Sequence, residues 1–208
     1  AQQRTAAAGP IVPGLGVANL DAVRANSNAF KTAQQQRPTT YKAQIDQANS
    51  RATQLQAQLK PLADKFDADR RAANPNQAAL QQQYGQIQQL QQSGQDEINR
   101  IMQPVALSEA YVVEQINDKL GQAIKQAIAK RKISLLITPD SIIDADNAYN
   151  MNQPILDELN VLLPSAQLVP PAGWEPREVR EQKAAAAARQ QGGAAAPAQP
   201  AGPQPQGR

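Results

Sequence analysis

The sequence of 208 residues contains no cysteine, no histidine and few aromatic residues: one Trp, four Tyr and two Phe. Without cysteine the chain cannot form disulfides, iron–sulfur clusters or thiolate zinc sites. Without histidine it lacks a histidine-based catalytic couple and the commonest metal ligand. Few aromatic side chains argue against a large globular core, because they supply much of the buried area of a protein. We therefore expect neither an enzyme nor a cofactor.

Long hydrophobic runs are also missing. No apolar stretch reaches the roughly 18 residues that a membrane span needs. The formal net charge of +3 is too small to indicate a nucleic-acid-binding protein. The chain begins at Ala1 without a methionine, which fits either a secreted protein whose signal peptide has been removed or a shortened chain.

Composition divides the chain into four parts. A short Ala-, Gln- and Pro-rich start is expected to be flexible, and the Pro-, Ala- and Gln-rich end is expected to be disordered. Between them we expect a mainly α-helical α+β fold, in which a small discontinuous body carries a long helical arm. The predicted boundaries are 1–13 for the flexible start, 14–30 and 106–165 for the body, 31–105 for the arm and 166–208 for the tail.

The arm carries the strongest pattern in the sequence. Its apolar residues follow one another at alternating spacings of four and three, which is typical of a coiled-coil seam. Most other positions are Gln, Lys, Asp or Ala, so this helix would be stable only against a partner helix. The predicted seam consists of Tyr41, Ile45, Ala48, Ala52, Leu55, Leu59, Leu62 and Phe66.

A second helix is expected to return along the first. The turn falls at Asn-Pro75-Asn, which disfavours continued helix before it and offers a cap to the next. Apolar residues then continue from Leu80 to Ile128, with a gap at Gly94. The first helix would run roughly 50 Å, so the hairpin should project from the body. Pro61 and Pro104 should kink the two helices, either as tolerated imperfections or as built-in bends.

The body is expected to contain two or three strands. The run Leu15–Leu20 predicts a strand that leads into a short helix with Asp21 near its start. The run Ile133–Thr138 predicts a strand covered on both faces, with a possible partner strand at Ile142–Ile143 and a helix after Asn152. So small a body should gain stability by oligomerising. The residues expected to contribute are Val17, Leu20, Ile133, Leu135 and Ile137.

Charge is unevenly distributed. Residues 31–73 carry eight basic and four acidic side chains, whereas residues 133–175 carry six acidic and no basic ones. The basic side chains near the hairpin tip are either a solvated surface or a client-contacting surface for acidic partners. They are Lys60, Lys65, Arg70 and Arg71.

Two further clusters are candidate sites. Asp144 and Asp146 begin like a calcium loop, but Ala148 and Tyr149 occupy positions that need an oxygen ligand and a glycine. Turn and capping roles are therefore expected for these carboxylates, and no metal. Residues 77–95 contain ten glutamines, which we interpret as a low-complexity helix surface.

The order of elements resembles the Skp/OmpH family of periplasmic chaperones for outer-membrane proteins. The resemblance lies in Gly16–Val23, in Ile133–Thr138, in the segment Asp144–Asn150 and in the helix with Ile155, Leu156 and Leu159. It covers about residues 14–163. The Gln-rich, less basic arm, its two prolines and the Ala/Pro/Gln tail depart from the family pattern.

The resemblance implies a function and an assembly. It implies a homotrimer with a barrel-like strand body, whose arms enclose a cavity that holds unfolded outer-membrane proteins without ATP, in the periplasm. Lipopolysaccharide or another membrane-surface lipid stays open as a partner, and nucleic acid is not expected. The alternative is a structural coiled-coil adaptor of the cell envelope. A nucleic-acid-binding protein is disfavoured by the weak net charge and the few aromatic residues.

Overall fold

A computed structural model describes residues 10–192 of the chain. By their internal contacts, the described residues fall into two compact units, with the boundary between residues 171 and 172. The described parts of each unit are taken separately below. The mainly helical α+β fold that the sequence predicts is confirmed, with long helices and a small parallel sheet.

The sheet consists of two short parallel strands, β1 (Leu15–Val17) and β2 (Leu135–Ile137). The two strands pair directly, although the whole arm lies between them in the sequence. Leu15 lies opposite Leu135, and Val17 lies opposite Ile137. Gly14, at φ +79°, turns its carbonyl to accept hydrogen bonds from the backbone N–H of Ser134 at 2.7 Å and of Leu135 at 2.9 Å. On its other edge β1 forms a single bridge with Asn150. The second edge of β2 is therefore left open within the described residues.

Three short helices complete the body around the base of the arm. They are α1 (Leu20–Asn26), α2 (Asn28–Thr40) and α5 (Asn152–Leu162). Ser27 separates the first two, since its buried hydroxyl accepts from the N–H of Phe30 at 3.2 Å and so caps α2. The apolar side chains of Val23, Ile155 and Leu159 are fully buried against the base of the long return helix.

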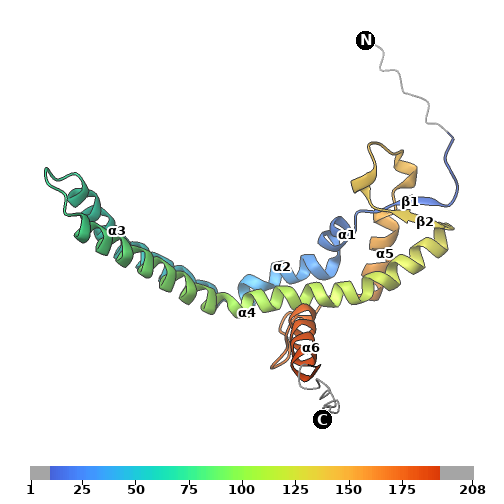
Figure 1. Cartoon of the computed structure of the whole chain (residues 1–208). Coiled ribbons are helices and arrows are strands. Elements are labelled where there is room, and N and C mark those ends of the chain that lie inside the picture. Colours follow the sequence, from blue (N-terminus) through green and yellow to red (C-terminus); the bar gives the residue numbers. More distant parts are fainter. Residues whose placement is uncertain (1–9, 193–208) are drawn as a thin grey trace, which may run out of the picture. The chain divides into compact units, whose positions relative to one another are not determined.

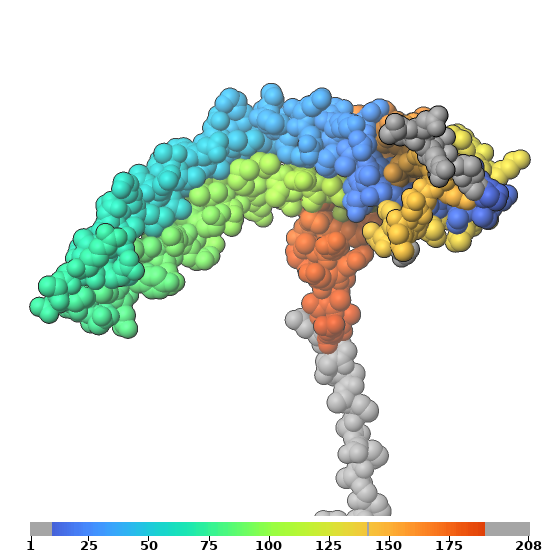
Figure 2. All heavy atoms as spheres, turned by 90° about the horizontal axis from the view of Figure 1, so that it is seen from above, coloured from blue at the N-terminus to red at the C-terminus, as the bar shows by residue number. Residues whose placement is uncertain are grey.

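The arm is an antiparallel pair of helices, α3 (Lys42–Arg70) and α4 (Gln77–Arg131), which lie side by side (Figures 1 and 2). Asn76 caps α4 by accepting from the N–H of Ala79 at 3.1 Å. With 55 residues, α4 is about 80 Å long, so it forms both the return half of the arm and part of the body core. Pro61 and Pro104 lie on the exposed side of unbroken helices, and Figure 1 shows the arm as a curved rod rather than a broken one.

Two expectations for the body are wrong. Ile142 and Ile143 form no strand; they follow the short helical turn η1 (Pro139–Ser141), and Ile143 is fully exposed. A second turn, η2 (Asn147–Tyr149), leads from there to α5. The strand β2 is not covered on both faces within one chain, because Leu135 is 56% exposed.

The region after residue 165 also differs from the expected disordered tail. Residues 166–171 pack on the body, where Leu168 is buried and its carbonyl accepts from the Ser108 hydroxyl at 2.7 Å. In the second unit, Arg177–Gly192 form the helix α6. Residues 1–9 of the expected flexible start and 193–208 of the expected tail lie outside the described residues.

Candidate functional site: the two-helix arm

The seam positions lie between α3 and α4 with one exception. Tyr41, Ala48 and Leu55 are buried, whereas Ala52 is exposed. Ala52 falls beside Arg51, which reaches across the seam to Glu97 on α4 with its Nε 2.6 Å from Oε2. The remaining seam residues are partly buried, so the arm is held by a thin apolar contact; they are Ile45, Leu59, Leu62 and Phe66.

At the Gly94 gap a side chain of α3 lies directly against the backbone of α4. Gly94 is buried, and a Cβ built there would lie 2.5 Å from Leu55 Cδ1. The side chain of Leu55 therefore occupies the space that any larger residue at position 94 would need. The sequence showed the gap in the apolar pattern but not the side chain that fills it.

Most of the predicted cations at the arm tip are neutralised by carboxylates on their own helix. Lys60 pairs with Asp64 at 2.8 Å, Lys65 with Asp69 at 2.6 Å and Arg70 more loosely with Asp67 at 3.3 Å. Each pair spans three or four residues, which places both side chains on one helix face. No such partner is found among the described residues for Arg71, which is the C-cap of α3 and is exposed.

Two pKa shifts at the tip follow from these pairs. The hydrogen bond and the charge of Asp64 raise the pKa of Lys60 above its usual value. Hydrogen bonds from Lys65 and Gln83 lower the pKa of Asp69. Both groups therefore stay charged near neutral pH, and four cations against three carboxylates leave only one net positive charge at the tip.

An apolar pocket of about 320 Å³ lies at the tip, next to the hairpin turn. Its aromatic residues Phe66 and Tyr84 have ring centroids 6.3 Å apart and tilted planes, while Leu80 is buried beneath them. Tyr84 is 53% exposed, and it is the one exposed large hydrophobic residue found between Lys42 and Val105. The pocket is lined by Phe66, Arg70, Pro75, Gln77, Leu80, Gln81 and Tyr84.

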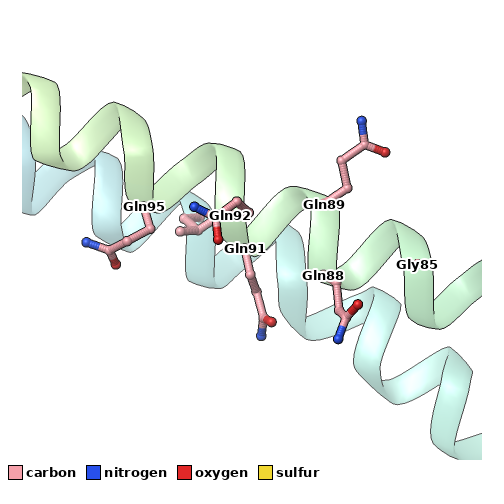
Figure 3. A pocket seen from close by; sticks show the side chains of 7 residues that line it. Gly85, Gln88, Gln89, Gln91, Gln92 and Gln95 are labelled. Carbon is pink, nitrogen blue, oxygen red and sulfur yellow. The ribbon is translucent and has the colours of Figure 1, made fainter. Parts of the chain in front are cut away.

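A larger groove of about 840 Å³ follows along the same helix toward the body. It is lined by glutamine side chains of α4, with Leu55 of α3 as its apolar contribution (Figure 3). The side chains lie near one another because i, i+3, i+4 and i+7 positions share a helix face. The lining residues are Leu55, Gly85, Gln88, Gln89, Gln91, Gln92 and Gln95.

The predicted oligomerisation residues gather at the sheet and the adjoining helix. Val17 and Ile137 lie opposite each other in the two strands and are partly exposed, as are Leu20 and Ile133. Leu135 is the most exposed of the five. These side chains therefore leave apolar area exposed on the two strands and on the residues that flank them.

Asp146, one of the carboxylates considered for calcium, forms a hydrogen bond with the backbone. Asp146 accepts from the N–H of Ala148 at 2.8 Å and caps the turn η2. This is the capping role that the sequence predicts. Across residues 10–192, no group of three acidic side chains is placed to hold a metal ion.

Two buried polar side chains in the body were not expected from the sequence. Ser108 on α4 is fully buried and ties down the 166–171 segment. Arg37 on α2 is only 9% exposed, and its Nε and Nη2 have no hydrogen-bond partner in the described part of the chain. Both residues lie inside helices, and nothing in the sequence pattern around them indicates that their side chains are buried.

These features define a class of protein: a small strand-containing body that carries a long helical hairpin. The sequence model of the family described as "Outer membrane protein (OmpH-like)" matches residues 14–159, which is most of the chain. The chain therefore belongs to the OmpH-like (Skp) family of outer-membrane protein chaperones, a non-enzymatic and periplasmic family.

A solved structure supports the fold. The chain is similar to a candidate outer membrane chaperone (OmpH-like) from Caulobacter crescentus CB15, with a TM-score of 0.50 and 20% sequence identity. The similarity covers 80% of this chain and 95% of the other. A search of curated proteins finds no match. None of the helices within residues 10–192 combines the length and the apolarity needed to cross a membrane.

Proposed function

We propose that the chain is an ATP-independent periplasmic holdase, which binds unfolded outer-membrane proteins between the arms of a homotrimer and prevents their aggregation. The observation that carries the proposal is the long, projecting α3–α4 arm, in a chain of the OmpH-like family. An arm of this kind offers a large surface for its mass.

The character of the arm surface supports weak and reversible binding. Its apolar residues mostly pack in the seam, and the tip pocket offers an apolar contact to a client. Burial of a client side chain there would contribute at most about 1.5–3 kcal/mol. Several such contacts from different arms would hold a client, and each could release separately when folding in a membrane offers better burial.

The open edge of β2 supports self-association. A two-stranded sheet is marginally stable alone, and parallel strands are normally buried on both faces. Pairing of β2 with another copy would satisfy its free backbone groups and cover Leu135. The proposed trimer would thus unite the strands in one barrel-like body and direct the arms around a shared cavity.

Dilution of a denatured porin tests the proposal. The porin should stay soluble when it is diluted from urea into buffer with a near-stoichiometric amount of this protein, whereas an unrelated helical protein should leave it to precipitate. Light scattering measures the outcome. Precipitation in the presence of an intact, folded oligomer would contradict the holdase and favour a purely structural coiled-coil role.

A further inference from the structure

We propose that the glutamine-lined groove of α4 binds the backbone of an extended client segment through side-chain amides, so that recognition does not depend on the sequence or charge of the client. This inference rests on the proposed holdase function and assigns the groove a role within it. Its occupant is one extended stretch of unfolded polypeptide.

The lining of the groove is neutral and rich in hydrogen-bonding groups. None of its lining residues is charged, and its one large apolar side chain, Leu55, is buried against Gly94. A charged ligand would find no counter-charge, and an apolar ligand would find little apolar area. A peptide backbone is the ligand that matches, since each residue offers one N–H donor and one C=O acceptor and carries no charge.

Hydrogen-bonding capacity remains in the groove after the contacts within the arm are formed. The Nε2 groups of Gln88, Gln92 and Gln95 donate to Tyr84, Asp96 and Asn99, each four residues away on α4. Each of these amides keeps a second N–H and a carbonyl oxygen, because a primary amide has two donors and an acceptor with two lone pairs. No side-chain hydrogen bond of Gln91 is found within residues 10–192.

The spacing of the amides suits an extended chain. Gln88, Gln91 and Gln95 extend to the same side of α4 (Figure 3). One helical turn advances about 5.4 Å, and two residues of a strand advance about 6.6 Å. Glutamine has enough rotatable bonds to absorb this difference, so successive turns of α4 can reach successive backbone groups on one edge of an extended segment.

A side-chain hydrogen bond links the groove to the tip pocket. Gln88 lines the groove, and its donation to the hydroxyl of Tyr84 at 2.8 Å joins it to a residue of the pocket. A bound segment could therefore lay its backbone along the glutamines and place one apolar side chain between Phe66 and Tyr84. The two sites would together favour extended segments with alternating side chains, such as unfolded strands.

A matched pair of double variants tests the inference. Gln88→Ala with Gln91→Ala removes two amides from the groove. Gln82→Ala with Gln86→Ala removes two exposed amides from another face of the same helix. Alanine keeps the helix in both cases. The groove variant should hold a denatured porin with about tenfold lower affinity, and the control variant should match the unmodified protein.

Two further measurements test whether the groove binds the backbone of the client. A short uncharged peptide of alternating threonine and valine should bind the unmodified protein, and its backbone N-methylated counterpart should bind it about tenfold more weakly. Binding should persist when salt rises from about 0.1 M to 1 M, because no charge is involved.

The failure of this inference is distinguishable from failure of the holdase. If the unmodified protein keeps the porin soluble but the groove variant does so equally well, or if N-methylation has no effect, the inference is overturned and the holdase stands. If the unmodified protein fails with the porin, the holdase itself is overturned.

Discussion

Gly94 fixes the spacing of the arm at the scale of a single residue. Glycine normally weakens a helix interior, by about 1 kcal/mol relative to alanine. At position 94 that cost is offset, because Leu55 enters the space above the backbone and becomes buried. Gly85 lies on the same helix, yet a Cβ there would meet nothing within 4 Å.

These two glycines should respond to the same substitution with opposite signs. Gly85→Ala should raise the free energy of unfolding by up to about 1 kcal/mol through helix propensity. Gly94→Ala should lower it by about 1–2 kcal/mol, because overpacking against Leu55 outweighs the gain in propensity. Urea denaturation followed by circular dichroism measures both. Equal stabilisation by the two alanines would show that Leu55 moves aside freely.

Arg37 is the least satisfied side chain in the described body. Its buried Nε and Nη2 have lost their hydration and gained no hydrogen-bond partner within residues 10–192. Arg51 has the same side chain but pairs with Glu97 on the facing helix. The two arginines therefore separate the effect of an unpaired buried charge from that of a paired one.

Replacement of these arginines by methionine, which keeps much of the aliphatic length, should again give opposite results. Arg37→Met should stabilise the folded chain by about 1–3 kcal/mol, since two buried nitrogen groups without hydrogen-bond partners are removed. Arg51→Met should destabilise it by up to about 1 kcal/mol, as the partly exposed pair is lost. Thermal unfolding of both variants at one protein concentration gives the comparison. Strong destabilisation by Arg37→Met would mean that an acceptor for Arg37 exists in the assembled protein.

At the scale of elements, the 166–171 segment is tied to α4 by side chains that reach its backbone. Ser108 donates to the Leu168 carbonyl at 2.7 Å, and Gln115 forms paired hydrogen bonds with the backbone of Gln167, each at 2.9 Å. These contacts bring a proline-rich segment onto the body without any regular secondary structure.

Ser108→Ala should release this segment. The change leaves the Leu168 carbonyl without its buried partner, which should lower the free energy of unfolding by about 1–2 kcal/mol. Amide hydrogen exchange should rise in residues 166–171 more than in α5, and proteolysis should cut there first. Ser93→Ala is the control, because Ser93 bonds within its own helix and is exposed. Unchanged exchange in residues 166–171 would show that Leu168 packing alone holds them.

The elements differ in how far the sequence could predict them. The hairpin could be predicted, because a repeat of 3.5 residues, an Asn-Pro-Asn turn and a return pattern all indicate the same structure. The 166–171 segment could not, because its position depends on a hydrogen bond between residues 60 apart in sequence. Ile142–Ile143 misled the interpretation, since two β-branched residues favour a strand only where a neighbour is available to pair with.

The site was predicted less completely than the fold. The tip cations were identified, but their carboxylate partners three or four residues away reduce the charge that they present. The glutamine groove was missed, because a run of glutamines has the composition of an ordinary solvated helix face. Only the placement of α3 beside α4 turns that face into the wall of a groove.

At the scale of the whole molecule, the proposed function depends on association through β2. Leu135 offers a way to test this without disturbing the single chain, because the side chain is 56% exposed and contributes little to the core. A charge at this position would have to be buried if β2 pairs with another copy, and a buried unpaired carboxylate is strongly unfavourable.

Leu135→Asp should therefore lower the mass measured by sedimentation from that of a trimer to that of a single chain, with its helical circular dichroism retained. Val161→Asp is the matched control, since Val161 is even more exposed but belongs to α5 and not to the sheet. A Leu135→Asp protein that remains trimeric would place the interface elsewhere on the chain. Loss of porin capture in Leu135→Asp alone, with each arm still folded, would show that holding a client requires several arms together, because the weak contacts of one arm are multiplied only by association.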